Sequence, residues 1–460
     1  MEVIFLKFKM NSTKVILKRI FIVILLSRLI GGGLQGQVVV DSTLLLSDQD
    51  MQWWRNAKFG LFVHYGLYAI LGKGEWAMFS QPVDAVEYAK LKDQFFCEKF
   101  HGKDWVAVAK NAGCKYMVVT ARHHDGFCLF GTHFGNYDAV NSAAKKDLIA
   151  EYAEAAHQAN MKMGIYYSPL DWRYPGFFFP DMYRSNAEEM KKQTYTQVRE
   201  LLTNYGKVDI LWYDGGEDNW IGFGGLLWDP ENGWHTRGFE KPYLGSFSWE
   251  PLKLNKMVRE LQPKVVINPR SGWMGDFQTQ EVGLKGKIND RPWELCTNLG
   301  GTAWGWTPKS ADQIMSIDSC IKLLVTVVCQ DGNLLLNVGP KASGEIEPVE
   351  VQRLKEIGDY LSKYGESIYN TRGGMYDAKW GGTTITDEAV YVHILKVPPD
   401  GTISLPLIKR KIISSRFMND NKKAEFVQTG EGIKLTNLIK HNETDLIVKL
   451  AVKKETAQNH

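Results

Sequence analysis

Short apolar runs alternate with longer amphipathic stretches through the middle of the chain. Six runs are rich in β-branched and aromatic residues, which is typical of buried strands: 58–65, 116–121, 162–167, 209–213, 265–268 and 333–338. Between them, apolar residues recur every three or four positions, which predicts one-faced helices at 104–111, 147–160, 187–205, 251–261 and 311–329. This alternation predicts repeated βα units and a parallel sheet.

The pattern changes after a further predicted helix at 348–364. Short alternating segments separated by turn residues follow, at 383–386, 389–395, 401–405 and 446–450. Such segments predict an antiparallel β-sandwich. At 460 residues the chain exceeds the size at which single cores usually stop growing. We therefore predict an α/β chain: a (β/α)8-like, TIM-type catalytic barrel, regular or irregular, at 37–366, then a β-sandwich domain at 367–460.

The N-terminus has the order of a secretory signal peptide. Lys14, Lys18 and Arg19 precede the apolar run 20–26, and a glycine-rich polar segment follows. Arg28 interrupts the apolar stretch, which leaves it shorter than the roughly 20 residues of a membrane-spanning helix. We predict a signal peptide at 1–36, export to the periplasm or outside the cell, and no stable membrane insertion after cleavage. A membrane-tethered N-terminus is the alternative.

Composition and charge exclude several classes of function. A net charge of +3, with dispersed basic residues, predicts no nucleic-acid partner. Fifteen Trp and nineteen Tyr suit a cleft that stacks aromatic rings on sugars, but a large aromatic core would have the same composition. The six cysteines lack CxxC spacing, which argues against a zinc ribbon or a redox motif. Export would permit disulfides, but the sequence does not assign any.

Polar and aromatic clusters follow the predicted strands. They begin at His64, Arg122, Ser168, Asp214 and Pro269, each directly after an apolar run. A (β/α)8-type barrel places its active site at the carboxyl ends of its strands. The clusters therefore predict one site at that end of the barrel.

Two carboxyl groups about 5 Å apart would allow hydrolysis of a glycosidic bond with retained configuration. Asp214 ends an apolar strand and precedes two glycines, so it is the candidate nucleophile; a turn or helix cap is the structural alternative. Glu281 and Glu294 are both candidates for the proton donor, because both lie near aromatic residues. Spacing does not choose between them.

Three histidines, His64, His123 and His124, raise the possibility of a metal site. Adjacent histidines at a strand end are expected to point to opposite sides, which disfavours shared coordination of one ion. Together with Glu75, Trp76 and Arg270, they instead offer hydrogen-bonding and stacking groups for sugar hydroxyls. Buried core histidines are a further alternative. We predict no metal and no cofactor.

Six motifs, in order, resemble glycoside hydrolase family 29, the retaining α-L-fucosidases. The resemblance runs from about Trp53 to about Tyr369 and is carried by KFGLFVHYGLY at 58–68, GEW at 74–76, TARHHDGF at 120–127, GIYYS at 164–168, LWYDG at 211–215 and GNLLLNVGP at 332–340. Chance agreement at this many positions is negligible. The resemblance implies a catalytic barrel followed by a β-sandwich.

The resemblance also implies roles for individual residues. Asp214 matches the nucleophile, and Glu281 is preferred to Glu294 because it follows a stretch of the family's Asp-aromatic-x-Thr type. Residues matching the sugar-binding positions are His64, Glu75, Trp76, His123, His124, Tyr166 and Arg270, with Trp212 and Trp304 as aromatic walls. The chain departs from the family at Tyr65, often Trp, and at Ala77, often Tyr. These departures predict reshaped walls around the sugar.

The predicted function is therefore an exo-acting retaining α-L-fucosidase whose partner is a glycan substrate. Because an apolar pocket rejects an added hydroxyl only weakly, an α-L-galactosidase for L-galactose or its 6-sulfate, as in algal galactans such as porphyran, is the alternative. A catalytically inactive carbohydrate-binding protein and a metal-dependent hydrolase are rivals from other classes. The sequence does not indicate the oligomeric state.

Overall fold

The computed structural model describes residues 41–81, 83–215, 226–229, 233–236, 247–284, 291–438 and 443–453. The predicted signal peptide lies outside these ranges. Within them, none of the helices combines the length and the apolar character needed to cross a membrane.

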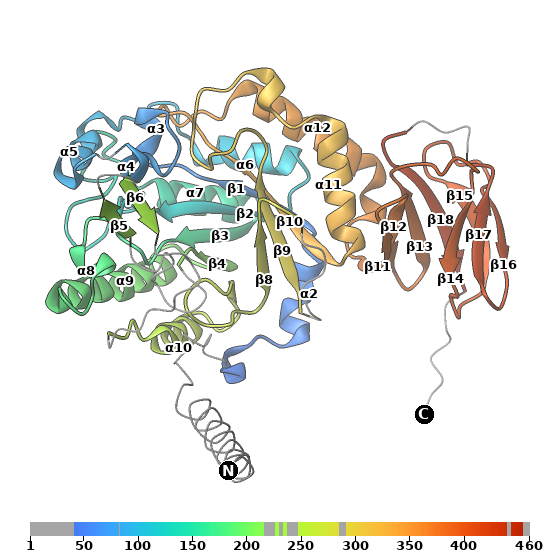
Figure 1. Ribbon diagram of the computed structural model, residues 1–460, viewed down its shortest axis with the longest axis horizontal. Coiled ribbons are helices and arrows are strands. Elements are labelled where there is room, and N and C mark those ends of the chain that lie inside the picture. Colours follow the sequence, from blue (N-terminus) through green and yellow to red (C-terminus); the bar gives the residue numbers. More distant parts are fainter. Residues whose placement is uncertain are drawn as a thin grey trace, which may run out of the picture.

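The larger part of the described chain consists of a curled parallel sheet and the helices around it (Figure 1). Eight of the described strands pair in the order β7-β4-β3-β2-β1-β10-β9-β8. Their bounds are β1 Phe59–Val63, β2 Tyr116–Arg122, β3 Lys162–Tyr167, β4 Ile210–Tyr213, β7 Val266–Ile267, β8 Gln278–Glu281, β9 Trp293–Asn298 and β10 Gly332–Val338. All carboxyl ends therefore meet at one end of the barrel, as the strand-end clusters predicted. A two-stranded antiparallel ribbon, β5 Leu226–Asp229 and β6 Gly233–Thr236, stands apart from this sheet.

All six predicted barrel strands are confirmed, but the predicted set lacked β8 and β9. The residues of β8 are polar and partly exposed, so no apolar run marks this strand in the sequence. The buried strand β9 contains Glu294 and Asn298, which break its apolar pattern. Parallel pairing with β10 places β9 in the sheet, and β8 then pairs with β9.

The two ends of the curled sheet meet at Asp276. Its backbone N–H donates to Ile267 O at 2.7 Å, and its carboxylate accepts from Ile267 N at 2.8 Å. Arg259 of α10 (Pro251–Leu261) forms an ion pair with the same carboxylate at 2.7 Å. A charged side chain thus joins β7 to β8 where no ladder pairing is present in the described residues.

Side chains from alternating strand positions fill the interior of the barrel. This inner cluster includes Phe62, Val118, Ile210, Val266, Cys296 and Leu335, with Trp54 from α2 (Asp48–Ala57) packed on Phe277. The opposite strand faces pack against an outer layer of helices. The longer ones after α2 are α6 Gly102–Asn111, α7 Leu148–Gln158, α9 Arg184–Thr203, α10 Pro251–Leu261, α11 Ile317–Cys329 and α12 Pro348–Tyr364.

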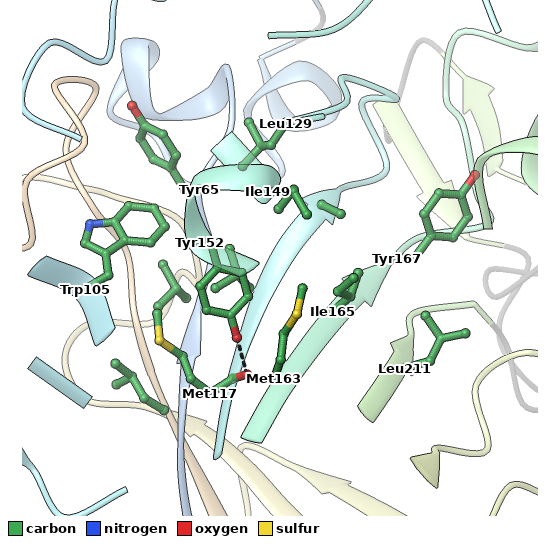
Figure 2. Close-up of a cluster of buried hydrophobic side chains, with 14 of the residues drawn as sticks. Tyr65, Trp105, Met117, Leu129, Ile149, Tyr152, Met163, Ile165, Tyr167 and Leu211 are labelled. Atoms are coloured by element: carbon green, nitrogen blue, oxygen red, sulfur yellow. Dashed lines mark hydrogen bonds between the residues drawn. The ribbon is translucent and has the colours of Figure 1, made fainter. Parts of the chain in front are cut away.

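Short helices lie mainly in the loops at the carboxyl ends of the barrel strands. They are α3 Tyr68–Leu71, α4 Ala77–Ser80, α5 Ala85–Ala89 and α8 Pro175–Phe178. Figure 2 shows part of the outer core, where Tyr152 of α7 donates from its hydroxyl to Met117 O of β2 at 2.6 Å. This bond satisfies the one polar atom that Tyr152 brings into an apolar layer.

The predicted helix 311–329 is interrupted. A single 3-10 turn covers Ala311–Gln313, and α11 begins only at Ile317. Ser316 caps α11, because its hydroxyl accepts from the N–H of Ser319. The Ser-rich junction therefore separates two elements that the apolar periodicity had joined.

Antiparallel sheets form the C-terminal part, as predicted (Figure 1). One contains β11 Arg372–Asp377, β12 Gly381–Ile385, β13 Ala389–Ile394, β18 Leu446–Val452 and β15 Ile412–Phe417, and the other β14 Ile403–Pro406, β17 Gly432–Thr436 and β16 Glu425–Gln428. They enclose an apolar cluster of their own, which includes Val392, Leu435 and Leu450. The boundaries of the two domains stay a prediction.

A buried polar cluster lies between α12 and the C-terminal sheets, and we call Asp445, Tyr360 and His393 the joint cluster. The hydroxyl of Tyr360 donates to Asp445 Oδ2 at 2.5 Å, and His393 Nδ1 lies 2.8 Å from the same oxygen. The other ring nitrogen of His393 lies 3.3 Å from Ser367 O, beyond the end of α12. Polar contacts thus connect α12 to both β13 and the start of β18.

All six cysteines are buried and unpaired. They lie between Cys97 and Cys329, and burial raises the pKa of each thiol. Buried thiols of this kind pack as small hydrophobic side chains.

Candidate active site

A cavity of about 190 Å³ opens at the carboxyl ends of the barrel strands. Its lining consists of Phe62, His64, Trp76, His123, His124, Tyr166, Trp212, Asp214, Arg270, Glu281 and Trp304. Of the eleven residues selected from the sequence, only Glu75 does not line it. The structure therefore brings together side chains from β1, β3, β4, β8 and the loops that follow the strands.

Asp214 directly follows β4 and receives donors from several sides. Its Oδ2 accepts from the hydroxyl of Tyr166 at 2.7 Å and lies 3.4 Å from His124 Nε2, while its Oδ1 accepts from Arg270 at 3.0 Å. Burial raises the pKa of Asp214, but the hydrogen bonds and positive charge of its partners outweigh burial and hold this pKa well below the ordinary range. Asp214 is therefore an anion at neutral pH.

Arg270 connects Asp214 to Glu281. One guanidinium nitrogen contacts Asp214, and the other contacts Glu281 Oε2 at 2.6 Å. The Arg270 side chain also lies over the ring of Trp212, 5.1 Å from its centroid. One guanidinium thus contacts two carboxyl groups at the cavity wall.

Glu294, the other candidate proton donor, lies in the barrel core beneath the cavity. Its two carboxyl oxygens accept from the hydroxyl of Tyr116 at 2.5 Å and the indole N–H of Trp212 at 3.0 Å. Burial raises the pKa of Glu294 to about 7. Because this carboxyl does not line the cavity, it supports Trp212 from below.

His64 presents a lone pair to the cavity. Its Nδ1 lies 2.7 Å from Asn337 Oδ1, and the Asn337 amide nitrogen donates to Asn298 Oδ1 and Trp304 O. The Asn337 oxygen is therefore the acceptor, so Nδ1 of His64 carries the proton and Nε2 is free to accept. Burial lowers the pKa of His64 to about 4, so the ring is neutral at pH 7.

The expectation that His123 and His124 point to opposite sides is wrong. Both follow the end of β2 at Arg122, where strand alternation no longer applies, and both rings line the cavity with centroids 4.1 Å apart. His123 stacks on Tyr166 at an interplanar angle of 8°. Burial lowers the pKa of His123 well below its usual value.

His123, His124 and Asp214 could together contact a metal ion, since each offers one ligand atom within 4.8 Å of the others. The guanidinium of Arg270 lies against the same carboxylate, at 3.0 Å, and opposes a further cation there. The same polar groups are suited to hydrogen bonds with hydroxyl groups.

Phe62 is a lining residue that the sequence analysis missed. Its ring lies 5.1 Å from that of Trp212 and 6.0 Å from that of Trp304, so the three form an apolar wall. The signal was present in the sequence: Phe62 and His64 are two positions apart at the end of one strand and therefore share a face.

Glu75 lies behind the wall. Its Oε2 accepts from the backbone N–H groups of Trp304 and Gly305, both at 2.7 Å. Burial raises the pKa of Glu75. In this structure the carboxyl group holds the loop that carries Trp304.

The two departures from the family pattern lie outside the lining of the cavity. Tyr65 is buried on the other side of its strand end, where its hydroxyl donates to Ala342 O at 2.7 Å. Ala77 is buried at the start of α4. The expectation of reshaped walls stays a prediction.

Comparisons with known proteins place this geometry in context. A family model described as Alpha-L-fucosidase matches residues 38–366. The tissue alpha-L-fucosidase of Rattus norvegicus is 27% identical over 384 residues, which cover 77% of this chain and 78% of the relative.

Two solved structures are similar over most of their length. Alpha-L-fucosidase isoenzyme 1 of Paenibacillus thiaminolyticus is 30% identical, with a TM-score of 0.73 over 88% of this chain and 99% of its own. A GH29 alpha-L-fucosidase of Bacteroides thetaiotaomicron, trapped as a covalent intermediate with 2-fluoro-fucosyl fluoride, is 25% identical, with a TM-score of 0.78 over 91% of this chain and 99% of its own.

Proposed function

The chain belongs to the α-L-fucosidase family of glycoside hydrolases, and we propose that it removes terminal α-L-fucose from glycans by a retaining mechanism in its barrel cavity. One observation carries the proposal: a single guanidinium, that of Arg270, contacts both Asp214 and Glu281 at the cavity wall. This arrangement supports the close carboxyl spacing, about 5 Å, of retaining enzymes. The wider spacing of inverting enzymes leaves room for a water molecule.

The proposed reaction has two steps. In the first, Asp214 attacks the anomeric carbon while Glu281 gives its proton to the departing glycosidic oxygen, which produces a fucosyl-enzyme ester and a free alcohol. In the second, Glu281 takes a proton from water as the water oxygen displaces Asp214, and fucose leaves with its original configuration. The low pKa of Asp214 keeps the nucleophile charged.

Glu281 suits the proton-transfer role better than Glu294 does. Glu281 lines the cavity, and its side chain is 36% exposed, so it can exchange protons with water between the steps. Glu294 has both oxygens occupied by Tyr116 and Trp212 in the core. A carboxyl group enclosed in this way does not reach a departing oxygen in the cavity.

The remaining lining residues are proposed to hold the sugar. Neutral His64 and His123, together with His124, Tyr166 and Arg270, offer donors and acceptors to hydroxyl groups. The rings of Trp76, Trp212 and Trp304 offer apolar faces, and Glu75 orders the Trp304 loop. A cavity of about 190 Å³ suits one terminal sugar, which fits exo action.

The fate of the chain in the cell extends this proposal. We infer that residues 1–36 direct export and are removed, which leaves a catalytic barrel at 37–366 and a sandwich domain at 367–460. N-terminal sequencing of the secreted or periplasmic protein tests the cleavage, and a mature chain that still begins before residue 30 would contradict it.

The decisive experiment combines substrate choice with stereochemistry. The purified mature chain is expected to release the aryl group from an aryl α-L-fucoside, and NMR is expected to show the α-anomer of fucose as the first product. An aryl α-L-galactoside is the matched comparison, and faster hydrolysis of that substrate would favour the L-galactosidase alternative. A folded chain that cleaves neither substrate would contradict the proposal.

A second experiment separates the two carboxyl candidates. Glu281→Gln is expected to lower kcat about 10²-fold to 10⁴-fold on substrates with poor leaving groups, and far less on a dinitrophenyl fucoside that needs no protonation. Glu294→Gln is the control and is expected to retain most activity on both. The opposite result would transfer the role to Glu294.

A further inference from the structure

Ser168, directly after β3, contacts the cavity histidine that faces Asp214. Its Oγ lies 2.6 Å from His124 Nδ1, and the other ring nitrogen of His124 lies 3.4 Å from Asp214 Oδ2. We propose that Ser168 is a positioning residue, which donates to Nδ1 and so fixes the ring proton of His124 on Nε2, directed at Asp214. The proposal rests on Asp214 being the nucleophile of the proposed function.

The hydrogen bonds around Ser168 set the direction of its own donor. Its Oγ accepts from the backbone N–H of Leu170 at 3.1 Å, which leaves the hydroxyl proton to find an acceptor. Three acceptors are in range: His124 Nδ1 at 2.6 Å, Leu170 O at 3.3 Å and Asp214 O at 3.5 Å. In the proposed arrangement the proton goes to His124 Nδ1, the nearest of the three.

This direction determines which nitrogen of a neutral His124 is the donor. When Nδ1 accepts, Nε2 carries the hydrogen and can donate toward the Asp214 carboxylate. With the reverse tautomer, a lone pair on Nε2 would face a negative oxygen at 3.4 Å. Ser168 thus directs the Nε2–H of His124 toward the carboxylate of Asp214.

Ser168 is itself held rigidly. Its residue is fully buried, its N–H donates to Arg122 O at 3.0 Å, and its carbonyl accepts from the Arg122 guanidinium at 2.9 Å. That guanidinium forms a buried ion pair with Asp171. The hydroxyl therefore has a fixed place from which to orient the ring.

Several charged or titratable groups surround His124 and can influence the pH dependence of the activity. They come from the ends of β1, β2, β4 and β7 and from the loop before α4: His64, His123, Asp214, Arg270 and Glu75. At Nδ1 of His124, the contact is with the hydroxyl oxygen of Ser168.

The test compares Ser168→Ala, Ser168→Thr and Ser168→Cys with a matched control, Ser142→Ala. Ser142 is also buried, and its Oγ also accepts an N–H two residues on, at 3.1 Å, but it donates to Ala139 O far from the cavity. Ser168→Ala is expected to lower kcat on an aryl α-L-fucoside about tenfold to a hundredfold, with little change in KM.

The pH profile supplies a second readout. Without the hydroxyl, Nδ1 can keep the ring proton, and Nε2 then no longer donates to Asp214. The dependence of kcat/KM on pH in Ser168→Ala is therefore expected to differ from that of the wild type. Ser168→Thr keeps a hydroxyl and is expected to restore the profile, whereas Ser168→Cys, a weak donor of similar size, falls between.

A third readout does not depend on activity. ¹⁵N NMR of histidine-labelled protein distinguishes the protonated ring nitrogen, and His124 is expected to change tautomer in Ser168→Ala but not in Ser142→Ala. An unchanged tautomer and pH profile in folded Ser168→Ala or Ser168→Cys would overturn the inference. If the wild-type chain failed to cleave the fucoside, the proposed function would fail while the NMR result still decided the role of Ser168.

Discussion

Two buried clusters in this chain use the same three kinds of side chain. In the cavity cluster, Tyr166 donates to Asp214 at 2.7 Å and His124 faces the same oxygen at 3.4 Å. In the joint cluster, Tyr360 donates to Asp445 at 2.5 Å and His393 faces the same oxygen at 2.8 Å. The donors and the carboxylate are of the same type in both clusters, but only the cluster around Asp214 lines the cavity.

The two clusters differ in access to solvent and in the presence of an arginine side chain. The Asp214 side chain is 21% exposed and also receives Arg270, while Asp445 is sealed and its Oδ1 has no hydrogen-bond partner among the described residues. An accessible and strongly stabilised carboxylate is available to react, whereas a sealed one can only hold structural elements together. The same set of side-chain types is therefore not sufficient to identify a reactive site.

Removing each carboxylate is the strongest test of the difference between the two clusters. Asp214→Gly is expected to lower kcat on the aryl α-L-fucoside by about 10⁴-fold or more, because no nucleophile remains. Added azide should restore turnover and yield the β-fucosyl azide, since the small anion attacks where Asp214 stood. A variant that stayed active without azide would contradict the assignment.

Asp445→Asn addresses the joint cluster. Removing the charge leaves His393 and Tyr360 with a poorer buried partner, so the free energy of unfolding in urea is expected to fall by about 3 kcal/mol. Activity per folded molecule should remain at the wild-type level. Loss of kcat at full folding would show that the joint cluster influences the cavity.

Glu294→Gln extends the test to a buried carboxyl group whose two contacts are with uncharged donors. The folded-state pKa, about 7, lies above the unfolded value of about 4.3, so the folded chain retains the proton that the unfolded chain releases. Its contribution to stability is therefore complete below about pH 4.3 and is lost as the pH rises to about 7.

The variant lacks this titration. The free energy of unfolding of the wild type minus that of Glu294→Gln is expected to fall by about 1–3 kcal/mol between pH 4.5 and pH 7.5. Urea unfolding at several pH values measures the difference. A difference independent of pH would show that Glu294 keeps an ordinary pKa.

The smallest expected effects come from the two tyrosines. Tyr166→Phe removes a donor to Asp214 and should lower kcat about tenfold, with a modest change in stability. Tyr360→Phe removes the matching donor to Asp445 and should lower the free energy of unfolding by about 1–2 kcal/mol while leaving kcat unchanged. Equal effects of the two variants on kcat and on stability would remove the distinction between the clusters.

Local sequence pattern was sufficient for most of the barrel and the site. Residues that end apolar strands, such as His64, Asp214 and Arg270, could be placed at one face because parallel strands align their carboxyl ends. The same logic failed for β8, whose polar residues depend on pairing with β9 rather than on burial. Strand pairing between distant segments is not visible in local periodicity.

The position of Glu75 illustrates a second limit. Its partners, the N–H groups of Trp304 and Gly305, are more than 200 residues away in the chain. Nothing near Glu75 in the sequence signals that contact. Spacing alone likewise left Glu281 and Glu294 as equal candidates, because it does not indicate that Glu281 lines the cavity and that Glu294 faces the core.

The buried cysteines have a practical consequence for following the protein in solution. All six thiols lie between Cys97 and Cys329 and are buried, so alkylating reagents reach them only when the fold around them opens. Cys329 lies next to Gly382 of β12, so its labelling also reports separation of the C-terminal sheets. Pulse labelling followed by mass spectrometry would therefore follow opening around each cysteine, without an introduced probe. Because the six cysteines form no disulfide, folding does not depend on an oxidising compartment. During refolding, a reductant should be present so that the exposed thiols do not form disulfides.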